Sequence, residues 1–478
     1  MTTTRTRRRL ARTAAVLLAT AVAVAAMPAA QAKPPKGDPA RVSETTKGEQ
    51  LDGYSSGLGL SEDGRSALFR SAATNLLPEP GTPNSDEVYV RNLRNGHVER
   101  ISVAPDGSRL NAPTADASIS GDGRYVAFST SATNVLPGQA AHQSDVFVRD
   151  RWTGRTELVT VGGVPGAGDQ SLFNATSPSI SRDGRYVAYV SNRSDLVPDP
   201  NVRRGKNNIY VTDRWTRTSR LVTVGADGDP ASDNSSEPSI SADGATIAFT
   251  SRAGNLLPDD PATSGPGSAD PGSTDPGSGP GTEPGTGSPE LASGPRYYSS
   301  YVWKADTGRI AVASLDGTGQ RAGSRYGRIS PDGRYAVYSL AVRNSGLPGH
   351  GSVRLDVYIH ELATGKVTKI NTGLPDTFAN GSASGAVMSA DGRWVYFDSY
   401  ADNLVPGDTN QATDLFRHDL WTGRVERISL TRDGGQSDTP SYDPFVDATG
   451  STVIFDALDG NLVPEDTNTL LDVYLRHL

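Results

Sequence analysis

The sequence predicts an all-β fold: a single seven-bladed β-propeller made of four-stranded antiparallel blades. Three observations lead to this prediction: a repeat that occurs seven times, strands that are apolar on both faces, and chain ends that complement each other. Residues 118–129 show the repeat best, because an Asp-Gly pair there separates two short apolar runs. That arrangement is a strong signal for a β-hairpin.

The Asp-Gly pairs recur at intervals of 59, 61, 60, 89, 59 and 58 residues, with Thr449-Gly450 in the seventh place. The six Asp residues are Asp63, Asp122, Asp183, Asp243, Asp332 and Asp391. A constant period of this kind indicates a repeat architecture. The long interval contains residues 259–295, which are rich in Pro, Gly and Ser. We expect a disordered insertion there, within the fourth blade.

Each repeat holds four expected strands, which in the second repeat are residues 117–120, 125–130, 146–149 and 156–161. The second of these strands is apolar on both faces, whereas a strand in a one-sided sheet would alternate. Small sheets that are covered on both faces by their neighbours are typical of a propeller.

The chain ends predict how the ring closes. Val42 lies 21 residues before Asp63, and the fourth-strand residue Ile101 lies 21 residues before Asp122. Residues 41–43 therefore have the register of a fourth strand, while the last repeat ends after its third. We expect this N-terminal strand to complete the last blade and to leave no open sheet edge.

Residues 1–32 predict a secretory signal peptide, which leaves residues 33–478 as the propeller. They contain five Arg, an apolar run at 14–26 and the small-residue site Ala30-Gln31-Ala32. The Arg pattern leaves both the general secretion and the twin-arginine routes open. Either route predicts a secreted, extracellular protein, and no later segment approaches the length of a membrane span.

Composition excludes several classes of protein. The chain has no cysteine, so disulfides and thiolate metal sites are not available. Removing residues 1–32 takes five of the 46 basic residues and none of the 54 acidic ones, which gives a net charge of −13. Such acidity disfavours nucleic acid and anionic membranes as partners. We expect a monomer that binds a protein, peptide or glycan.

The recurrent Ser-x-Asp-Gly-Arg-Tyr-Val-Ala-Phe, the following Asp-Val-Phe/Tyr-Val and the Thr-Gly-Arg/Lys turn resemble the WD-repeat-like repeats of TolB-type β-propellers. The resemblance covers essentially the whole mature chain. The Asn-Leu-Val-Pro-Gly-Asp-Thr-Asn stretch resembles a secreted actinobacterial-type subgroup. The resemblance implies a propeller that serves as a binding platform or as an accessory domain of an enzyme.

Two loops carry spaced oxygen ligands that could hold Ca²⁺. These are Asp408, Asn410 and Asp414 in the sixth repeat, and Asp466, Asn468 and Asp472 in the seventh. Calcium takes six to eight oxygen ligands, so backbone or water oxygens would have to complete each shell. The alternative is a turn that simply ends with an Asp before the third strand. Apart from calcium, no cofactor is expected.

Three tryptophans, Trp152, Trp215 and Trp421, recur before the turn that joins the third and fourth strands, beside Arg155, Arg217 and Arg424. An aromatic rim with Arg could bind a carbohydrate. The alternative is packing across the hairpin with an Arg stacked on each ring.

No catalytic motif is recognisable, so the sequence predicts a non-enzymatic binding or scaffold protein that uses its long, variable loops. Two alternatives stay open. One is a glycan hydrolase or lyase with carboxylates in the central funnel, which two converging carboxylates of raised pKa would favour. The other is a calcium-stabilised structural protein of the cell surface.

Overall fold

The structure is a computed structural model that describes residues 37–79, 85–162, 172–198, 201–202, 205–258, 298–343, 353–375, 377–458, 460–463 and 466–478. Residues 37–478 hold 28 strands in seven sheets of four antiparallel strands. The seven-bladed propeller fold is therefore confirmed. Within the described part of the chain, no helix is long and apolar enough to cross a membrane. The predicted signal peptide and the predicted insertion at 259–295 lie outside the described residues.

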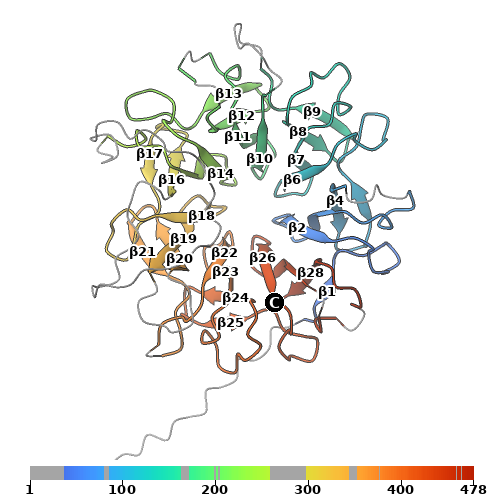
Figure 1. Cartoon of the computed structure of the whole chain (residues 1–478), viewed down its shortest axis with the longest axis vertical. Coiled ribbons are helices and arrows are strands. Elements are labelled where there is room, and N and C mark those ends of the chain that lie inside the picture. The colour runs from blue at the N-terminus through green and yellow to red at the C-terminus, as the bar shows by residue number, and fades with distance from the viewer. Residues whose placement is uncertain are drawn as a thin grey trace, which may run out of the picture. The chain divides into compact units, whose positions relative to one another are not determined.

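The strands of each blade follow one another in the chain, and Figure 1 shows the first strand of every blade nearest the centre of the ring. Blades 1 to 3 are β2 (Ser55–Leu60), β3 (Ser66–Ser71), β4 (Glu87–Asn92), β5 (Val98–Arg100); β6 (Thr114–Ile119), β7 (Tyr125–Thr130), β8 (Asp145–Asp150), β9 (Arg155–Leu158); and β10 (Ala175–Ile180), β11 (Tyr186–Ser191), β12 (Asn208–Asp213), β13 (Thr218–Leu221).

Blades 4 to 7 repeat this order. They are β14 (Ser235–Ile240), β15 (Thr246–Ser251), β16 (Ser299–Lys304), β17 (Ile310–Val312); β18 (Ser324–Ile329), β19 (Tyr335–Arg343), β20 (Val353–Glu361), β21 (Lys366–Lys369); β22 (Ala383–Met388), β23 (Trp394–Ser399), β24 (Asp414–Asp419), β25 (Val425–Arg427); and β26 (Ser441–Val446), β27 (Thr452–Ala457), β28 (Asp472–His477) with β1 (Ala40–Arg41).

The N-terminal strand closes the ring as predicted. Strand β1 pairs with β28, with Ala40 opposite Leu475 and Arg41 opposite Tyr474. The backbone N–H of Val42 continues the pairing with a 2.7 Å hydrogen bond to the carbonyl of Val473. Strand β1 is thus the fourth strand of the last blade, and it covers the edge of β28.

The core explains why the second strands are apolar on both faces. Every blade has one stacked aromatic pair between its second and third strands, such as Phe128 and Phe147, whose ring centroids are 5.7 Å apart. The other six pairs are Phe69–Tyr89, Tyr189–Tyr210, Phe249–Tyr301, Tyr338–Tyr358, Phe397–Phe416 and Phe455–Tyr474. The neighbours Val126 and Ala127 on β7 are also fully buried, because the blades on both sides cover this strand.

The Asp-Gly hairpins are held by one repeated hydrogen-bond pattern. In blade 2, Ser120 Oγ donates to Asp122 Oδ1 at 2.7 Å, and the backbone N–H of Arg124 donates to the same oxygen at 2.9 Å. Gly123 takes a φ of 72°, which favours glycine over residues with a side chain. These turns are therefore structural.

Strand bounds in blade 2 differ from the prediction mainly at the outer ends. The first strand begins at Thr114, three residues earlier than expected, and the fourth ends at Leu158, three residues earlier. The early start follows from a register shift between Thr114 and Asp116, which interrupts the alternation of apolar residues that the prediction relied on.

Candidate functional site

The innermost strands, which line the centre of the ring, are irregular in every blade. Each shows a register shift against its second strand. In five blades a residue at the shift has a left-handed backbone: Ser177 (φ 52°), Glu237 (φ 54°), Tyr326 (φ 56°), Gly385 (φ 61°) and Asp443 (φ 49°). For a non-glycine residue this conformation costs about 1–3 kcal/mol, and such strain tends to gather at functional sites. The centre of the ring is therefore the first place to look for a site.

Asp398, on the second strand of blade 6, lies opposite Ser384 of the innermost strand β22, and so beside the centre of the ring, which we call the channel. Its carboxylate Oδ1 accepts a 2.8 Å hydrogen bond from Ser384 Oγ on β22. Its Oδ2 lies 2.1 Å from where a Cβ would stand on Gly385, so a side chain at that position would displace the carboxylate from its present place. Burial raises the pKa of Asp398 to about 6, and the charge of Asp443 adds to the rise.

Asp456 has the equivalent place in blade 7, on the second strand, and is 1% exposed. Its Oδ1 accepts a 2.7 Å hydrogen bond from the backbone N–H of Gly57 on the neighbouring blade 1. Burial raises the pKa of Asp456 to about 8, and the charge of Asp443 again adds to the rise. The exposed side chain of Asp443 thus interacts with two buried carboxyl groups whose pKa values are raised.

Two guanidinium groups lie near these carboxyl groups. Arg328, on β18, is half-buried, and its Cζ is 5.6 Å from the centre of the Phe445 ring on β26. Burial lowers the pKa of Arg328, while the charges of Asp443, Glu237 and Asp398 oppose that shift. Arg70, on β3, interacts with Asp456, and its Nε is buried without a hydrogen-bond partner. Carboxyl groups and unpaired guanidinium nitrogens therefore meet at the channel.

A pocket of about 310 Å³ opens beside the strained residues of blades 4 and 5. Glu237 and Tyr326 line it together with Arg325 and Tyr298. The carboxylate of Glu237 accepts a 3.2 Å hydrogen bond from the backbone N–H of Tyr326, which ties the two first strands together. This pocket gives a ligand access to the inner strands.

The sequence prediction missed the channel residues Asp398, Asp443, Asp456, Arg70 and Arg328. A signal was present in the second strands, where Asp398, Asp456 and Arg70 follow the aromatic residue at the place that Ser129, Thr250 and Ser339 have in other repeats. A charged residue inside a doubly apolar strand is unusual and indicates a special environment. Only the closed ring shows that these positions, 328 residues apart between Arg70 and Asp398, belong to one site.

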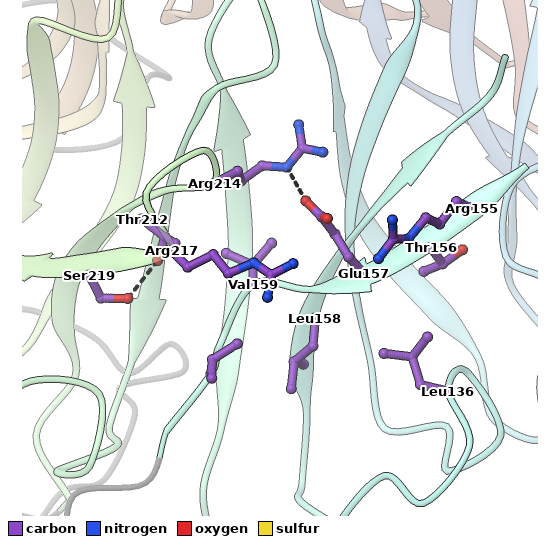
Figure 2. A pocket seen from close by; sticks show the side chains of 11 residues that line it. Leu136, Arg155, Thr156, Glu157, Leu158, Val159, Thr212, Arg214, Arg217 and Ser219 are labelled. Atoms are coloured by element: carbon purple, nitrogen blue, oxygen red, sulfur yellow. Dashed lines mark hydrogen bonds and ion pairs between the residues drawn. The ribbon is translucent and has the colours of Figure 1, made fainter. Parts of the chain in front are cut away.

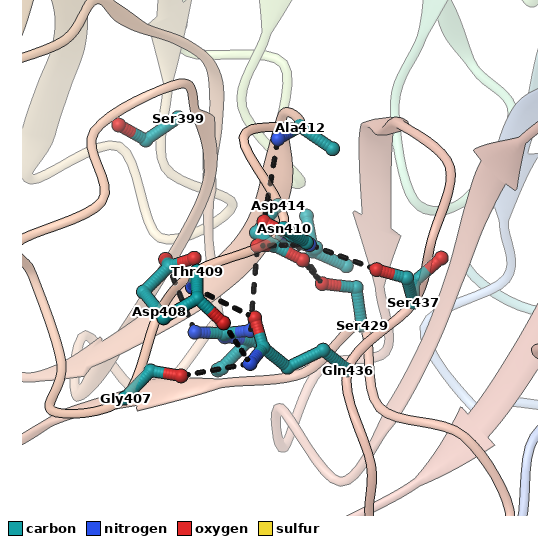
Figure 3. A network of polar contacts seen from close by, with 12 residues as sticks. Ser399, Gly407, Asp408, Thr409, Asn410, Ala412, Asp414, Ser429, Gln436 and Ser437 are labelled. Atoms are coloured by element: carbon teal, nitrogen blue, oxygen red, sulfur yellow. Dashed lines mark hydrogen bonds and ion pairs between the residues drawn. The ribbon is translucent and has the colours of Figure 1, made fainter.

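The predicted calcium ligands of blade 6 form a network with an arginine, which Figure 3 shows. The guanidinium of Arg427 lies 3.1 Å from Asp408 Oδ2 and 3.5 Å from Asp414 Oδ2. Asn410 Nδ2 donates to Asp414 Oδ2 at 3.0 Å, and Ser429 Oγ donates to the other Asp414 oxygen. Burial raises the pKa of Asp408 to about 6, against the effect of Arg427. These contacts stabilise both carboxylates with a cation that the chain itself supplies.

The two predicted aspartate ligands of blade 7 also lie beside an arginine. Arg41 from the closing strand lies 3.7 Å from Asp466 and 3.8 Å from Asp472. Asn468 is turned away and donates to the carbonyl of Leu51 at 3.0 Å. Among the residues that the structure describes, no group of three or more His, Cys, Asp or Glu side chains could hold a metal ion. Calcium binding is not tested by this geometry and stays a prediction.

The three tryptophans are exposed and stacked on arginine, but not on the arginines beside them in the sequence. Trp152 and Trp215 are 70% and 66% exposed. Their partners are Arg124 and Arg185, whose Cζ atoms lie 4.6 and 4.7 Å from the ring centres. Trp421 is paired with Arg393 in the same way. The stacking arginine comes from the Asp-Gly turn of the same blade.

Arg155 and Arg217 line a different feature, a pocket of about 370 Å³ between the outer strands of blades 2 and 3 (Figure 2). Its one carboxylate, Glu157, is paired with Arg214 at 2.6 Å. Leu158, Val159 and Val161 form its apolar part. This pocket is larger than the one at blades 4 and 5, and neither of the two is lined by the carboxyl groups whose pKa is raised.

No protein-family model matches this chain, and no curated protein sequence is similar to it. Solved structures do share its fold. An oligogalacturonate lyase from Vibrio parahaemolyticus is 12% identical with a TM-score of 0.52, and the match covers 92% of this chain and 93% of the lyase. An acylaminoacyl peptidase from Pyrococcus horikoshii is 16% identical with a TM-score of 0.46, and the match covers 88% of this chain and 51% of the peptidase.

A TolB-like protein from Agrobacterium tumefaciens is 15% identical with a TM-score of 0.38, and the match covers 82% of this chain and 98% of that protein. Of the predicted resemblance to TolB-type proteins, the propeller fold is shown by the seven four-stranded sheets of the chain itself. No match supports membership of that family or of the actinobacterial-type subgroup.

The prediction that the chain is not an enzyme is contradicted by this comparison, because an enzyme, the oligogalacturonate lyase, shares its fold. That prediction was based on the absence of a catalytic motif with a fixed spacing. Motifs of that kind do not reveal sites built from the inner strands of several blades, where the residues are far apart in the sequence.

Proposed function

We propose that this chain is an enzyme that cleaves glycans by acid–base catalysis at the channel carboxyl groups. The observation that carries the proposal is the meeting of Asp398, Asp443 and Asp456 at blades 6 and 7. Burial raises the pKa of Asp398 to about 6 and that of Asp456 to about 8, whereas Asp443 is exposed. Carboxyl groups whose environments separate their pKa values are a common source of acid and base roles.

The roles follow from exposure. Asp443 is exposed and has a left-handed backbone, so it is the carboxylate that can act as a base toward a substrate. Asp398, at 7% exposure with a pKa of about 6, can donate a proton to the leaving oxygen of a glycosidic bond. Asp456 is almost fully buried and holds Gly57, which makes it a positioning residue.

In a hydrolysis, the water oxygen bonds to the anomeric carbon while Asp443 takes a water proton. At the same time the bond to the leaving oxygen breaks, and that oxygen takes the proton of Asp398. The oligogalacturonate lyase with the same fold supports a glycan as the substrate, and it makes elimination the alternative way of breaking the bond. The predicted signal peptide supports action on a glycan outside the cell.

The test is a search for turnover with a panel of neutral and acidic polysaccharides, using the wild type and D398N, D443N and D456N. We expect cleavage of at least one glycan, with kcat lowered at least 100-fold in D398N and D443N, which is the range for loss of a general acid or base. Asp106, an exposed residue of the turn after β5, provides the control D106N. Product analysis separates hydrolysis from elimination. Full activity in both D398N and D443N would overturn the proposal.

A further inference from the structure

Within the described part of the chain, two arginines of the channel, Arg70 and Arg328, lack the close carboxylate partner that several buried arginines have. Arg193, for comparison, lies 2.8 Å from Asp145 and makes two 2.9 Å hydrogen bonds with Asp195. Arg427 is likewise held by Asp408 and Asp414. Among the described residues, by contrast, no carboxylate lies within 4.0 Å of the guanidinium of Arg70 or of Arg328, although acidic side chains are near.

Unused donors on a guanidinium that is removed from water are costly. The Nε of Arg70 is buried and has no partner. Arg328 is held by its position over the Phe445 ring, a contact that orients the guanidinium but uses none of its hydrogen-bond donors. Both groups therefore keep donors available at the place where the substrate is expected.

A guanidinium presents its donors as a planar fork that matches a carboxylate in two parallel hydrogen bonds. The carboxylates Asp443 and Glu237 interact with Arg328 without pairing with it, so the site already contains negative charge. A planar carboxylate with a single charge adds less repulsion there than a doubly charged phosphate would. The donors and the charge around them thus favour a carboxylate over a phosphate.

We propose that the substrate is a glycan that carries carboxylate groups, such as a chain of uronic acids, and that Arg328 and Arg70 bind those carboxylates. This inference rests on the proposed function for the statement that the ligand is a glycan. It adds which glycans enter the channel and which residues select them. Both arginines are specificity residues, separate from the carboxyl groups that move protons.

The test measures binding calorimetrically in the D398N background, so that cleavage does not consume the ligand. The probes are a panel of uronic-acid trimers and the same trimers as methyl esters, which removes the charge and keeps the sugar. We expect at least one acidic trimer to bind at least tenfold more tightly than its ester. R328Q and R70Q should each remove that preference, whereas R155Q, on the outer pocket, should leave it unchanged.

The variant R328K keeps the charge but loses the fork, so it should recover only part of the preference, and it replaces R328Q if that variant does not fold. Equal binding of acids and esters across the panel would overturn the inference, as would full preference in both R328Q and R70Q. Acid-selective binding without any cleavage by the wild type would support this inference and refute the proposed function. Cleavage by the wild type without tighter binding of the acidic trimers would support the proposed function and refute this inference.

Discussion

The hydroxyl of Ser43 donates a 2.5 Å hydrogen bond to the carboxylate of Asp472, although the two residues are 429 positions apart. The same hydroxyl accepts a 2.9 Å hydrogen bond from the backbone N–H of Val473. This pair joins the N-terminal segment to the last blade. In other blades the equivalent contact lies within one repeat, as between Thr160 and Asp145 at 2.7 Å. Ring closure therefore uses the ordinary joint between a third and a fourth strand.

Removal of residues 33–45 should lower the melting midpoint sharply, because it exposes the edge of β28 and leaves the buried carboxylate of Asp472 without Ser43. A milder variant, S43A, should cost about 1–3 kcal/mol of unfolding free energy, the usual penalty for a buried group that loses its partner. Differential scanning calorimetry measures the melting midpoint of the deletion variant and the loss of unfolding free energy in S43A. The control is T153A, which lies in an exposed turn. A midpoint that stays unchanged in the deletion would contradict the closure.

Arg427 forms ion pairs with Asp408 and Asp414, so removing its charge should strongly lower the free energy of unfolding. All three side chains are at most 5% exposed. R427M should destabilise the fold by about 3–5 kcal/mol, because two buried carboxylates would lose their partner. Urea denaturation measures this loss. A loss below about 1 kcal/mol would show that Arg427 is not what stabilises these carboxylates.

The calcium hypothesis has a separate test on the same carboxylates. If Ca²⁺ is bound in the wild type, EDTA should lower its melting midpoint, and added Ca²⁺ should restore it. If the ion competes with Arg427 for the two carboxylates, R427M should respond to Ca²⁺ more strongly than the wild type. An unchanged midpoint of the wild type in EDTA would refute calcium as a stabilising ion.

Asp456 predicts a pH dependence of stability. Its pKa is raised to about 8 in the folded chain, above the ordinary value of 3.8. The folded state therefore keeps a proton that the unfolded state releases between about pH 4 and pH 8. The contribution of Asp456 to the free energy of unfolding therefore falls as pH rises through that window, by at most about 1.4 kcal/mol per pH unit. Urea titrations from pH 4 to pH 9 should show a smaller decline in D456N, and equal slopes would contradict the assignment.

Replacing Gly385 with alanine should lower activity. The reasons are the lack of space for a Cβ next to Asp398 and the left-handed backbone at this position. A Cβ there would lie 2.1 Å from Asp398 Oδ2, and the φ of 61° disfavours any side chain. Gly423 has a φ of 73° and nothing within 4 Å of the place that a Cβ would take, so G423A isolates the backbone cost of about 1–2 kcal/mol. G385A should cost more than this and should also lower kcat. Equal stability and activity in the two variants would show that Asp398 does not need its present place.

The sequence by itself determined the architecture of this protein. The sequence shows local or periodic features: six Asp-Gly hairpins with Thr449-Gly450 in the seventh place, second strands with two apolar faces, and the spacing of Val42 from Asp63. They act within one repeat, so they can be recognised without knowing how the repeats are arranged. For this reason the number of blades, their four strands and the closing strand were all predicted, whereas the bounds of individual strands differ by up to three residues.

Only the tertiary structure decided which residues share a site. Asp398, Asp443, Asp456, Arg328 and Arg70 come from four blades, and nothing in their spacing marks them as neighbours. Their pKa values depend on burial and on charges from other strands, which exist only once the ring is closed. The same is true of Arg427 and Arg41, whose pairing with the predicted calcium ligands depends on the approach of separate segments. Periodicity specifies a fold through contacts near in sequence, whereas a channel is made by contacts between positions far apart in it.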